Sequence, residues 1–170
     1  MHKPLAVGAA AFLLFVTIGP WAHAATHDDG PRLSHAEHRL VKAVNAYRED
    51  KGLAPLSVDP ILMREARNSA PHFSHQIGGR WCWHRCRARG FRGWATDDIA
   101  NGYPTPEDAV QGWATSDGHA MQMKGYFKMN GRWQNYKFNR IGVGISGRKY
   151  IAIFGRDSAA AEKRNKSSKS

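Results

Sequence analysis

Apolar side chains recur every three or four positions in three segments of the chain. This spacing predicts amphipathic helices over residues 34–52, 59–70 and 105–113. Ser34 and Glu37 form a capping box at the start of the first segment, and an Asp or Thr followed directly by proline opens each of the other two. Each predicted helix has one apolar face, so each needs a partner layer.

Two apolar segments rich in β-branched residues predict strands over 137–146 and 149–154, and Gly147-Arg148 between them predicts an antiparallel hairpin. Helices come first along the chain and strands come last, without a regular alternation of the two. This order predicts an α+β domain in which helices pack on a mainly antiparallel sheet.

The segments between these elements have weaker patterns. Residues 76–93 are rich in glycine and arginine, which predicts irregular structure with about one turn of helix. Ser116 is a candidate cap for a short helix, and the segment through Asn130 and Gly131 predicts a polar loop.

The two ends of the chain differ in composition from the domain between them. Residues 1–24 contain Lys3, an apolar run and a small-residue cleavage site, which predicts a secretory signal peptide. The alternative is a retained anchor, but the run is shorter than the roughly 20 residues that a spanning helix needs. Residues 25–33 predict a linker, 34–156 one folded domain and 157–170 a disordered basic tail. The protein is therefore expected to be secreted or periplasmic, without a transmembrane segment after cleavage.

The chain carries a formal net charge of +11, and the predicted leader contains only one of the charged residues. An exported protein of this charge favours contact with anionic surfaces, such as phospholipid head groups or acidic envelope polymers. Export also argues against nucleic acid as the partner, because most nucleic acid stays in the compartment that the protein leaves.

The segment 80–92 concentrates this charge beside aromatic rings and contains no acidic residue. Arginine binds phosphate and carboxylate bidentately, and aromatic rings favour wet interfaces, so the segment predicts an anion-binding or membrane-surface patch. Its members are Arg80, Arg85, Arg87, Arg89, Arg92, Trp81 and Trp83. The alternative is that the rings fill the core while the arginines are solvated. The remaining tryptophans, at positions 94, 113 and 133, are expected in the core.

Cys82 and Cys86 are the only cysteines of the chain. In an oxidising compartment we expect them to form a disulfide, which closes only a small loop. The alternative is a zinc site that combines both thiols with nearby histidines.

Four further side chains are candidates for a metal site. His75, Asp97, Asp98 and His119 come from three separate segments and lie beside residues typical of turns, so a fold can gather them over a sheet. Two imidazoles and one carboxylate make a zinc set with one open position. The alternative for His119 is a helix-start residue that is hydrogen-bonded to backbone or water.

Several ordered motifs resemble the CAP superfamily, which includes cysteine-rich secretory proteins, antigen 5 and plant pathogenesis-related proteins. Within the superfamily they resemble the bacterial SCP branch. The motifs are VNAYREDKGLAPLSVDPIL, FSH, DDIANGYPTPEDAVQGWATSDGHAMQM, RIGVGIS and YIAIFG. The resemblance extends from about residue 37 to residue 155.

The resemblance implies a three-layer α-β-α sandwich with a central cleft, in which two histidines and two acidic residues can hold a divalent metal. His75 and His119 match the two histidines, and Asp97 matches the first acid with Asp in place of Glu. Asp98 stands where the family has Asn. Ser116 stands where the family has the second acid, and Asp117 is the nearest residue that can compensate.

These observations give three hypotheses. The first is a secreted, non-catalytic binding module for an apolar or anionic ligand, with lipid or sterol suggested by the resemblance and an envelope polymer by the charge. The second is a metal-dependent hydrolase in which His75, Asp97 and His119 hold zinc and polarise water. The third is a basic adhesion protein of the cell envelope.

Overall fold

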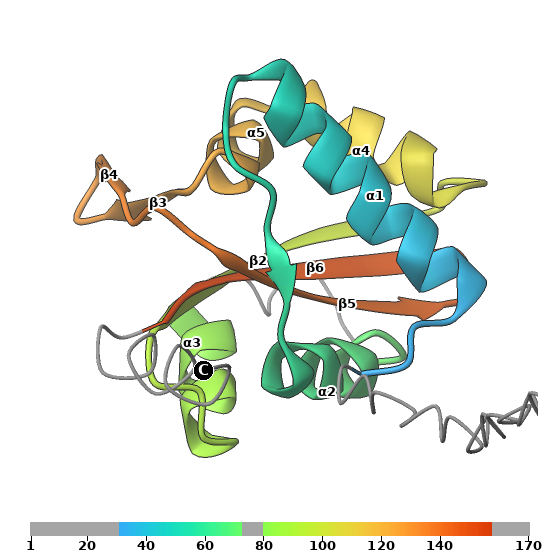
Figure 1. Cartoon of the computed structure of the whole chain (residues 1–170), viewed down its shortest axis with the longest axis horizontal. Coiled ribbons are helices and arrows are strands. Elements are labelled where there is room, and N and C mark those ends of the chain that lie inside the picture. The colour runs from blue at the N-terminus through green and yellow to red at the C-terminus, as the bar shows by residue number, and fades with distance from the viewer. Residues whose placement is uncertain (1–30, 73–79, 158–170) are drawn as a thin grey trace, which may run out of the picture.

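The computed structural model describes residues 31–72 and 80–157, and it describes only the backbone of residues 80 and 81. Its centre is a four-stranded sheet in the order β1-β5-β6-β2 (Figure 1). The strands are β1 (Ser57–Val58), β2 (Trp94–Asn101), β5 (Arg140–Ser146) and β6 (Lys149–Arg156). β6 pairs antiparallel with both β2 and β5, and β1 lies parallel to β5. The predicted hairpin and the mainly antiparallel sheet are confirmed.

Helices cover both faces of this sheet. One face carries α1 (His35–Asp50), α4 (Pro106–Ala114) and α5 (Asp117–Met123), and the other carries α2 (Pro60–Ser69) and α3 (Arg80–Ala88) (Figure 1). Each side has its own apolar cluster: α1 and α4 pack over one, and α2 and α3 pack over the other. The predicted α+β class and the three-layer arrangement are therefore confirmed.

The three predicted helices begin where their capping residues predict. Ser34 and Glu37 form the capping box of α1. Asp59 accepts hydrogen bonds from the first backbone N–H groups of α2, and Thr105 caps α4 through the Asp108 N–H. In each case a side-chain oxygen satisfies a backbone donor that has no partner inside the helix.

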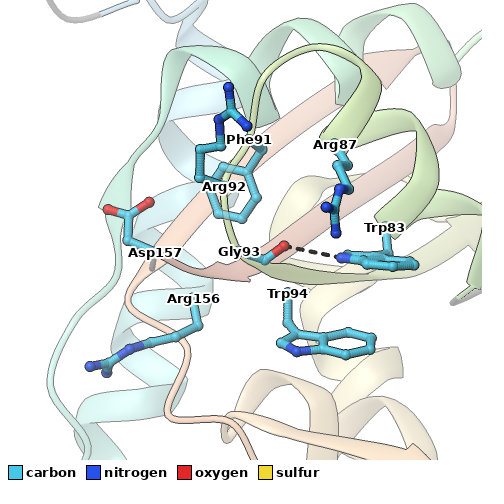
Figure 2. Close-up of a pocket in the computed structure, with 8 residues that line it drawn as sticks. All are labelled: Trp83, Arg87, Phe91, Arg92, Gly93, Trp94, Arg156 and Asp157. Atoms are coloured by element: carbon cyan, nitrogen blue, oxygen red, sulfur yellow. Dashed lines mark hydrogen bonds between the residues drawn. The ribbon is translucent and has the colours of Figure 1, made fainter. Parts of the chain in front are cut away.

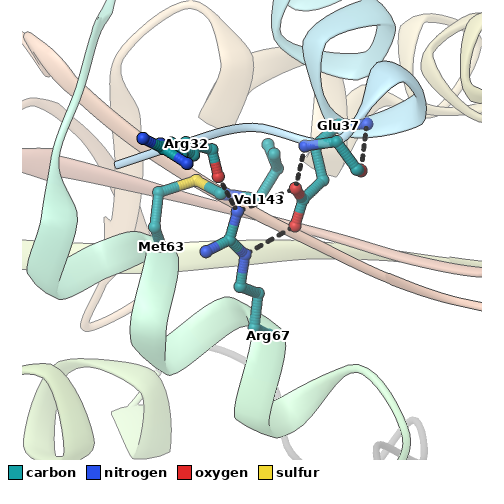
Figure 3. A network of polar contacts seen from close by, with 6 residues as sticks. Arg32, Glu37, Met63, Arg67 and Val143 are labelled. Atoms are coloured by element: carbon teal, nitrogen blue, oxygen red, sulfur yellow. Dashed lines mark hydrogen bonds and ion pairs between the residues drawn. The ribbon is translucent and has the colours of Figure 1, made fainter. Parts of the chain in front are cut away.

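Glu37 also joins the two helical layers. Its carboxylate accepts hydrogen bonds from Arg67 Nε at 2.7 Å and Arg67 Nη2 at 2.8 Å, so α1 is tied to α2 across the end of the sheet (Figure 3). Burial raises the pKa of Glu37, but the hydrogen bonds from Arg67 and Ser34 outweigh it and leave the pKa lowered. The capping residue of α1 thus also fixes how α2 packs.

The glycines of the RIGVGIS segment allow α2 to lie directly on β5. A Cβ atom on Gly142 would lie 2.1 Å from the backbone of Leu62, and one on Gly144 would lie 2.2 Å from the backbone of Ala66. No side chain larger than hydrogen fits in this contact. The glycines alternate with Ile141 and Val143, which pack on the other side of the strand.

Three segments differ from the sequence-based expectation. The predicted irregular segment contains the nine-residue helix α3, the residues around Asp97 form strand β2, and the predicted polar loop is a hairpin of β3 (Tyr126–Met129) and β4 (Arg132–Asn135). Asn130 and Gly131 have positive φ angles of 50° and 78°, as expected for a two-residue hairpin turn. Periodicity did not reveal these elements, because arginines interrupt the apolar pattern of α3 and two aspartates interrupt that of β2.

Candidate functional site

Asp97 and Asp98 lie in the middle of β2, not on a loop as expected, and adjacent residues of a strand point to opposite faces of its sheet. Ala95, two residues before Asp97, belongs to the apolar cluster under α2 and α3. Ala100, two residues after Asp98, belongs to the cluster under α1 and α4. The side chains of Asp97 and Asp98 therefore point toward different helical layers of the sandwich.

Asp98 is fully buried, and neither of its carboxylate oxygens has a hydrogen-bond partner among the described residues. Burial, together with the nearby charge of Asp97, raises the pKa of Asp98 well above its usual range. A buried carboxyl without partners is more stable when it is protonated. A neutral acid is close in shape to the Asn that the family places at this position.

His119 lies in the first turn of α5, on the same side of the sheet as Asp98. Its Nδ1 atom is 3.0 Å from Ser116 Oγ. Ser116 is the N-cap of α5 as predicted, but its hydroxyl makes no capping hydrogen bond to the backbone. α5 is held against β2 by the hydrogen bond from Thr96 to Gln122. Ser116 thus holds the imidazole but supplies no charge, and Asp117 beside it is exposed.

These positions bear on the predicted metal site of His75, Asp97 and His119. His75 lies outside the described residues. Within residues 31–72 and 82–157, no cluster of three or more His, Cys, Asp or Glu side chains has the geometry to hold a metal ion. By strand alternation Asp97 belongs to the α3 side, whereas α5 carries His119 on the other side. The donor set is thus incomplete among the described side chains, and the metal site stays a prediction.

Cys82 and Cys86 lie one turn apart on α3, and both are fully buried. Their Sγ atoms are 3.7 Å apart, which is hydrogen-bond distance for two thiols and longer than a disulfide bond. Burial, the hydrogen bond to Cys86 and the charge of Asp97 raise the pKa of Cys82 well above its usual range. Zinc binds the thiolate, so a zinc site here would require these buried thiols to lose their protons. The disulfide itself stays a prediction.

In the predicted basic patch, the side chains of Arg80 and Trp81 lie outside the described residues. The other four arginines divide into two groups with different surroundings. Arg85 and Arg89 each donate from Nε to one carboxylate oxygen of Glu65, a residue of α2 that is only 1% exposed. Ser69 donates to the same carboxylate at 2.9 Å. Burial raises the pKa of Glu65, but the hydrogen bonds from Arg89, Arg85 and Ser69 outweigh it and leave the pKa lowered. These two arginines fasten α3 to α2.

Arg87 and Arg92 belong to the second group, which surrounds a pocket of about 390 Å³ (Figure 2). We call it the tryptophan–arginine pocket, and it is lined by Trp83, Arg87, Phe91, Arg92, Gly93, Trp94, Arg156 and Asp157. The single acid of this set, Asp157, accepts a hydrogen bond from Arg140 at 2.8 Å. The pocket therefore carries a net positive charge.

Two stacked indoles form one wall of the pocket. The rings of Trp83 and Trp94 lie 4.8 Å apart between centroids, at an interplanar angle of 17°. Trp83 Nε1 donates to the Gly93 carbonyl at 3.2 Å, and the Arg87 guanidinium lies 5.5 Å from the Trp83 ring (Figure 2). Gly93 must be glycine, because a Cβ atom there would lie 1.6 Å from the Arg156 carbonyl oxygen.

A second pocket, of about 540 Å³, shares both indoles as lining residues. Phe127, Lys128 and Met129 of the β3–β4 hairpin line its other side. The Trp83–Trp94 pair is thus the common wall of two hollows, one bordered by arginines and the other by the hairpin.

Trp83 belongs to the predicted basic aromatic patch and lines this pocket, but two other lining residues, Trp94 and Arg156, were not predicted. Trp94 and Trp133 were expected in the core, and this was wrong, since they are 38% and 37% exposed. Only Trp113 is buried as expected, at 2%. Arg156 lies next to Gly93 across the sheet, a proximity created by the pairing of β2 with β6. The GW pair at 93–94, which follows an aromatic-rich helix, is a local signal that Trp94 belongs with this patch.

Comparison with known proteins places the chain in a family. Residues 41–150 match the model of the cysteine-rich secretory protein (CAP) family. The chain is 30% identical over 121 residues to the uncharacterized protein YkwD from Bacillus subtilis, and the match covers 66% of this chain and 43% of YkwD.

Solved structures with the same fold include proteins from three bacteria. An extracellular SCP-domain protein from Bacillus anthracis has a TM-score of 0.57 at 22% identity, with 75% of this chain and 45% of that chain covered. A cysteine-rich secretory protein from Staphylococcus aureus has a TM-score of 0.55 at 17% identity, with 71% and 38% covered. An outer surface protein from Borrelia burgdorferi has a TM-score of 0.58 at 17% identity, with 76% and 99% covered.

The chain thus spans less than half the length of the curated relative and of the first two structures. None of the helices in the described residues is long and apolar enough to cross a membrane. The family match covers most of the folded domain, and the three-layer sandwich agrees with it. The chain belongs to the cysteine-rich secretory protein (CAP) family.

Proposed function

We propose that this chain is a secreted or periplasmic, non-catalytic binding module whose ligand occupies the tryptophan–arginine pocket. The ligand carries an anionic group, such as a phosphate, on an apolar or ring-shaped body. The observation that carries the proposal is the stacked Trp83–Trp94 wall beside Arg87 and Arg92. Support for export comes from the predicted leader and from two structural relatives that are described as extracellular and outer surface proteins.

The two kinds of side chain suit the two parts of such a ligand. Indole faces bind apolar or ring-shaped groups, and a pocket of this volume is within the usual range for small-molecule sites. Guanidinium groups bind phosphate or carboxylate bidentately. Arg87 and Arg92 are exposed, whereas the carboxylate of Glu65 holds Arg85 and Arg89. Only the first pair is thus proposed as ligand-binding.

The ligand chemistry has two possible sources in an envelope, and the test separates them. A short-chain phosphatidic acid below its micelle concentration represents a lipid, and a glycosyl phosphate represents an envelope polymer. Inorganic phosphate is the ring-free reference. We expect at least one of the first two to quench tryptophan fluorescence and to bind more tightly than inorganic phosphate.

Variants test whether this pocket is the site. The double variant Arg87→Gln/Arg92→Gln should weaken binding by roughly 100-fold or more, because each of the two lost charged hydrogen bonds contributes about 1.5 kcal/mol or more. The control Lys42→Gln/Arg64→Gln removes two exposed cations from α1 and α2 and should bind as the parent does. If the two double variants bind the ligand equally well, this pocket is ruled out as the proposed site. The same holds if the parent binds inorganic phosphate as tightly as it binds the phosphatidic acid and the glycosyl phosphate.

A further inference from the structure

The β3–β4 hairpin projects from the body of the protein beyond the edge of the helical layers (Figure 1). Every residue of β4 is exposed, including Trp133 at 37%. Its base is fixed by Tyr136, whose ring lies 5.5 Å from Trp94 and 6.1 Å from Phe138, and whose N–H donates to the Gly125 carbonyl. The hairpin therefore has an anchored base and an open tip.

The charge of this hairpin has one sign. Residues 126–137, YFKMNGRWQNYK, contain Lys128, Arg132 and Lys137 and no acid. Lys128 lies directly opposite Trp133 in the strand register, and its Nζ atom is 5.9 Å from the Trp133 ring. A large apolar ring and a cation thus share one exposed face of the hairpin.

Met129 lies opposite Arg132 in the same register, on the other face of the hairpin. An apolar side chain and a cation therefore occur together on both faces near the tip. This arrangement fits the boundary of a bilayer, where indole rings sit at head-group level and lysine and arginine reach the phosphates. A flexible polyanion would use the cations but would not need an exposed ring beside them.

We propose that the β3–β4 hairpin docks this protein on an anionic phospholipid surface, with Trp133 in the head-group region and Lys128 and Arg132 on lipid phosphates. The proposal adds an interaction surface outside the tryptophan–arginine pocket and does not depend on what that pocket binds. The net charge of +11 favours the same partner, because it attracts the whole molecule to an anionic membrane.

Flotation of the purified chain with vesicles tests the proposal. Vesicles of phosphatidylcholine with phosphatidylglycerol should bind the parent chain, and pure phosphatidylcholine vesicles should not. Binding should fall as salt shortens the Debye length, which is about 8 Å at 0.15 M. Lipids brominated near the head group should quench part of the tryptophan fluorescence of the parent, and this part should be lost in Trp133→Phe.

Two variants divide the contributions. Lys128→Gln/Arg132→Gln should weaken vesicle binding by about 25-fold, or about fivefold for each cation near a lipid surface. Trp133→Ser should weaken it by roughly tenfold, because the apolar contact with the head-group region is lost. Lys42→Gln/Arg64→Gln removes the same charge elsewhere and should retain most binding. All three variants should unfold at the parent temperature, since the altered residues are exposed.

The outcomes separate this surface from the pocket and from other partners. Parent-like vesicle binding by Trp133→Ser, or equal binding to neutral vesicles, overturns the proposal. Full competition by soluble polyphosphate, together with no effect of Trp133→Ser, would assign the hairpin to a polyanionic chain instead. Arg87→Gln/Arg92→Gln should still float with anionic vesicles, so the pocket proposal can fail while this one stands.

Discussion

Glu65 and Asp98 are both buried carboxyl groups, and they lie on opposite sides of the central sheet. Glu65, on the α2–α3 side, is 1% exposed and accepts hydrogen bonds from Arg85, Arg89 and Ser69. Asp98, on the α4–α5 side, is fully buried, and its oxygens have no hydrogen-bond partner among the described residues. Burial raises the pKa of both groups, but the net shifts have opposite signs.

The difference shows that the hydrogen-bond and ion-pair partners of a buried carboxyl group, rather than its degree of burial, decide whether it is ionised in this protein. Two cations near Glu65 keep it ionised, and the ion pairs join α2 to α3. Asp98 has no cation that lowers its pKa, so its neutral form is favoured in a strand that packs against α4 and α5. Ionised Glu65 should therefore stabilise the fold, whereas ionisation of Asp98 should destabilise it.

Replacing Glu65 by Gln should produce the largest effect. The variant leaves two arginines without their carboxylate, and breaking a buried ion pair costs about 3–5 kcal/mol. Because Arg85 and Arg89 are about a third exposed, we expect a loss of about 2–3 kcal/mol in the free energy of unfolding, measured by urea denaturation. The control Glu49→Gln changes an exposed residue of α1 and should lie within about 0.5 kcal/mol of the parent.

A loss no larger than that of Glu49→Gln would mean that the ion pairs contribute nothing to stability. Ionised Glu65 would then not stabilise the fold, and the contrast with Asp98 on the other side of the sheet would be lost.

The pH dependence of unfolding should show the Glu65 contribution separately. Because its folded-state pKa is lowered, the folded protein binds fewer protons than the unfolded chain as the pH falls. The stability that Glu65 confers is therefore complete above the unfolded-state pKa of about 4.3 and is lost as the pH falls through the folded-state pKa. Subtracting the Glu65→Gln curve from the parent curve should reveal this acid-dependent part. A difference that is constant between neutral pH and pH 3 would contradict the assignment.

Replacing Asp98 by Asn should have the opposite sign. The amide keeps the shape of the carboxyl but cannot ionise, so the variant should be more stable than the parent by about 1 kcal/mol at high pH. Because the folded-state pKa of Asp98 is raised, the parent loses stability as the pH rises above the unfolded-state pKa, until the folded group is ionised.

The gain from Asp98→Asn should therefore disappear below about pH 4, where the acid is neutral in both states. Thermal unfolding at several pH values measures it. A variant that is less stable than the parent at every pH would show that the carboxyl has a structural role which the amide cannot fill.

Local chemistry was enough to predict most of the fold. Capping residues fixed the starts of α1, α2 and α4, and alternation with a glycine turn fixed the β5–β6 hairpin. α3 and β2 were missed because their stability comes from tertiary partners. Arg85 pairs with Glu65, which is 20 residues earlier in the chain, and β2 pairs along its whole length with β6. Neither partner can be read from a local window.

The candidate site was predictable only in part, for the same reason. The segment 80–92 was identified as a basic aromatic patch, but its sequence cannot say which arginines face α2 and which face solvent. Asp97 and Asp98 carry identical side chains, and only the pairing of β2 shows that they belong to opposite layers. Trp94 was assigned to the core because tryptophan is usually buried, whereas here its neighbour Trp83 covers one face and leaves part of the ring exposed.

The smallest expected effect comes from the arginines that face the tryptophan–arginine pocket. Arg87→Gln should change the free energy of unfolding by no more than about 0.5 kcal/mol, because Arg87 is exposed and its guanidinium lies over the Trp83 ring rather than in an ion pair with Glu65. Arg85→Gln, two residues earlier on the same helix, removes an ion pair to Glu65 and should cost about 1–2 kcal/mol. Measuring both in one urea series separates the arginines that hold α3 in place from those available to a ligand. Equal costs for the two variants would mean that the helix has no such division.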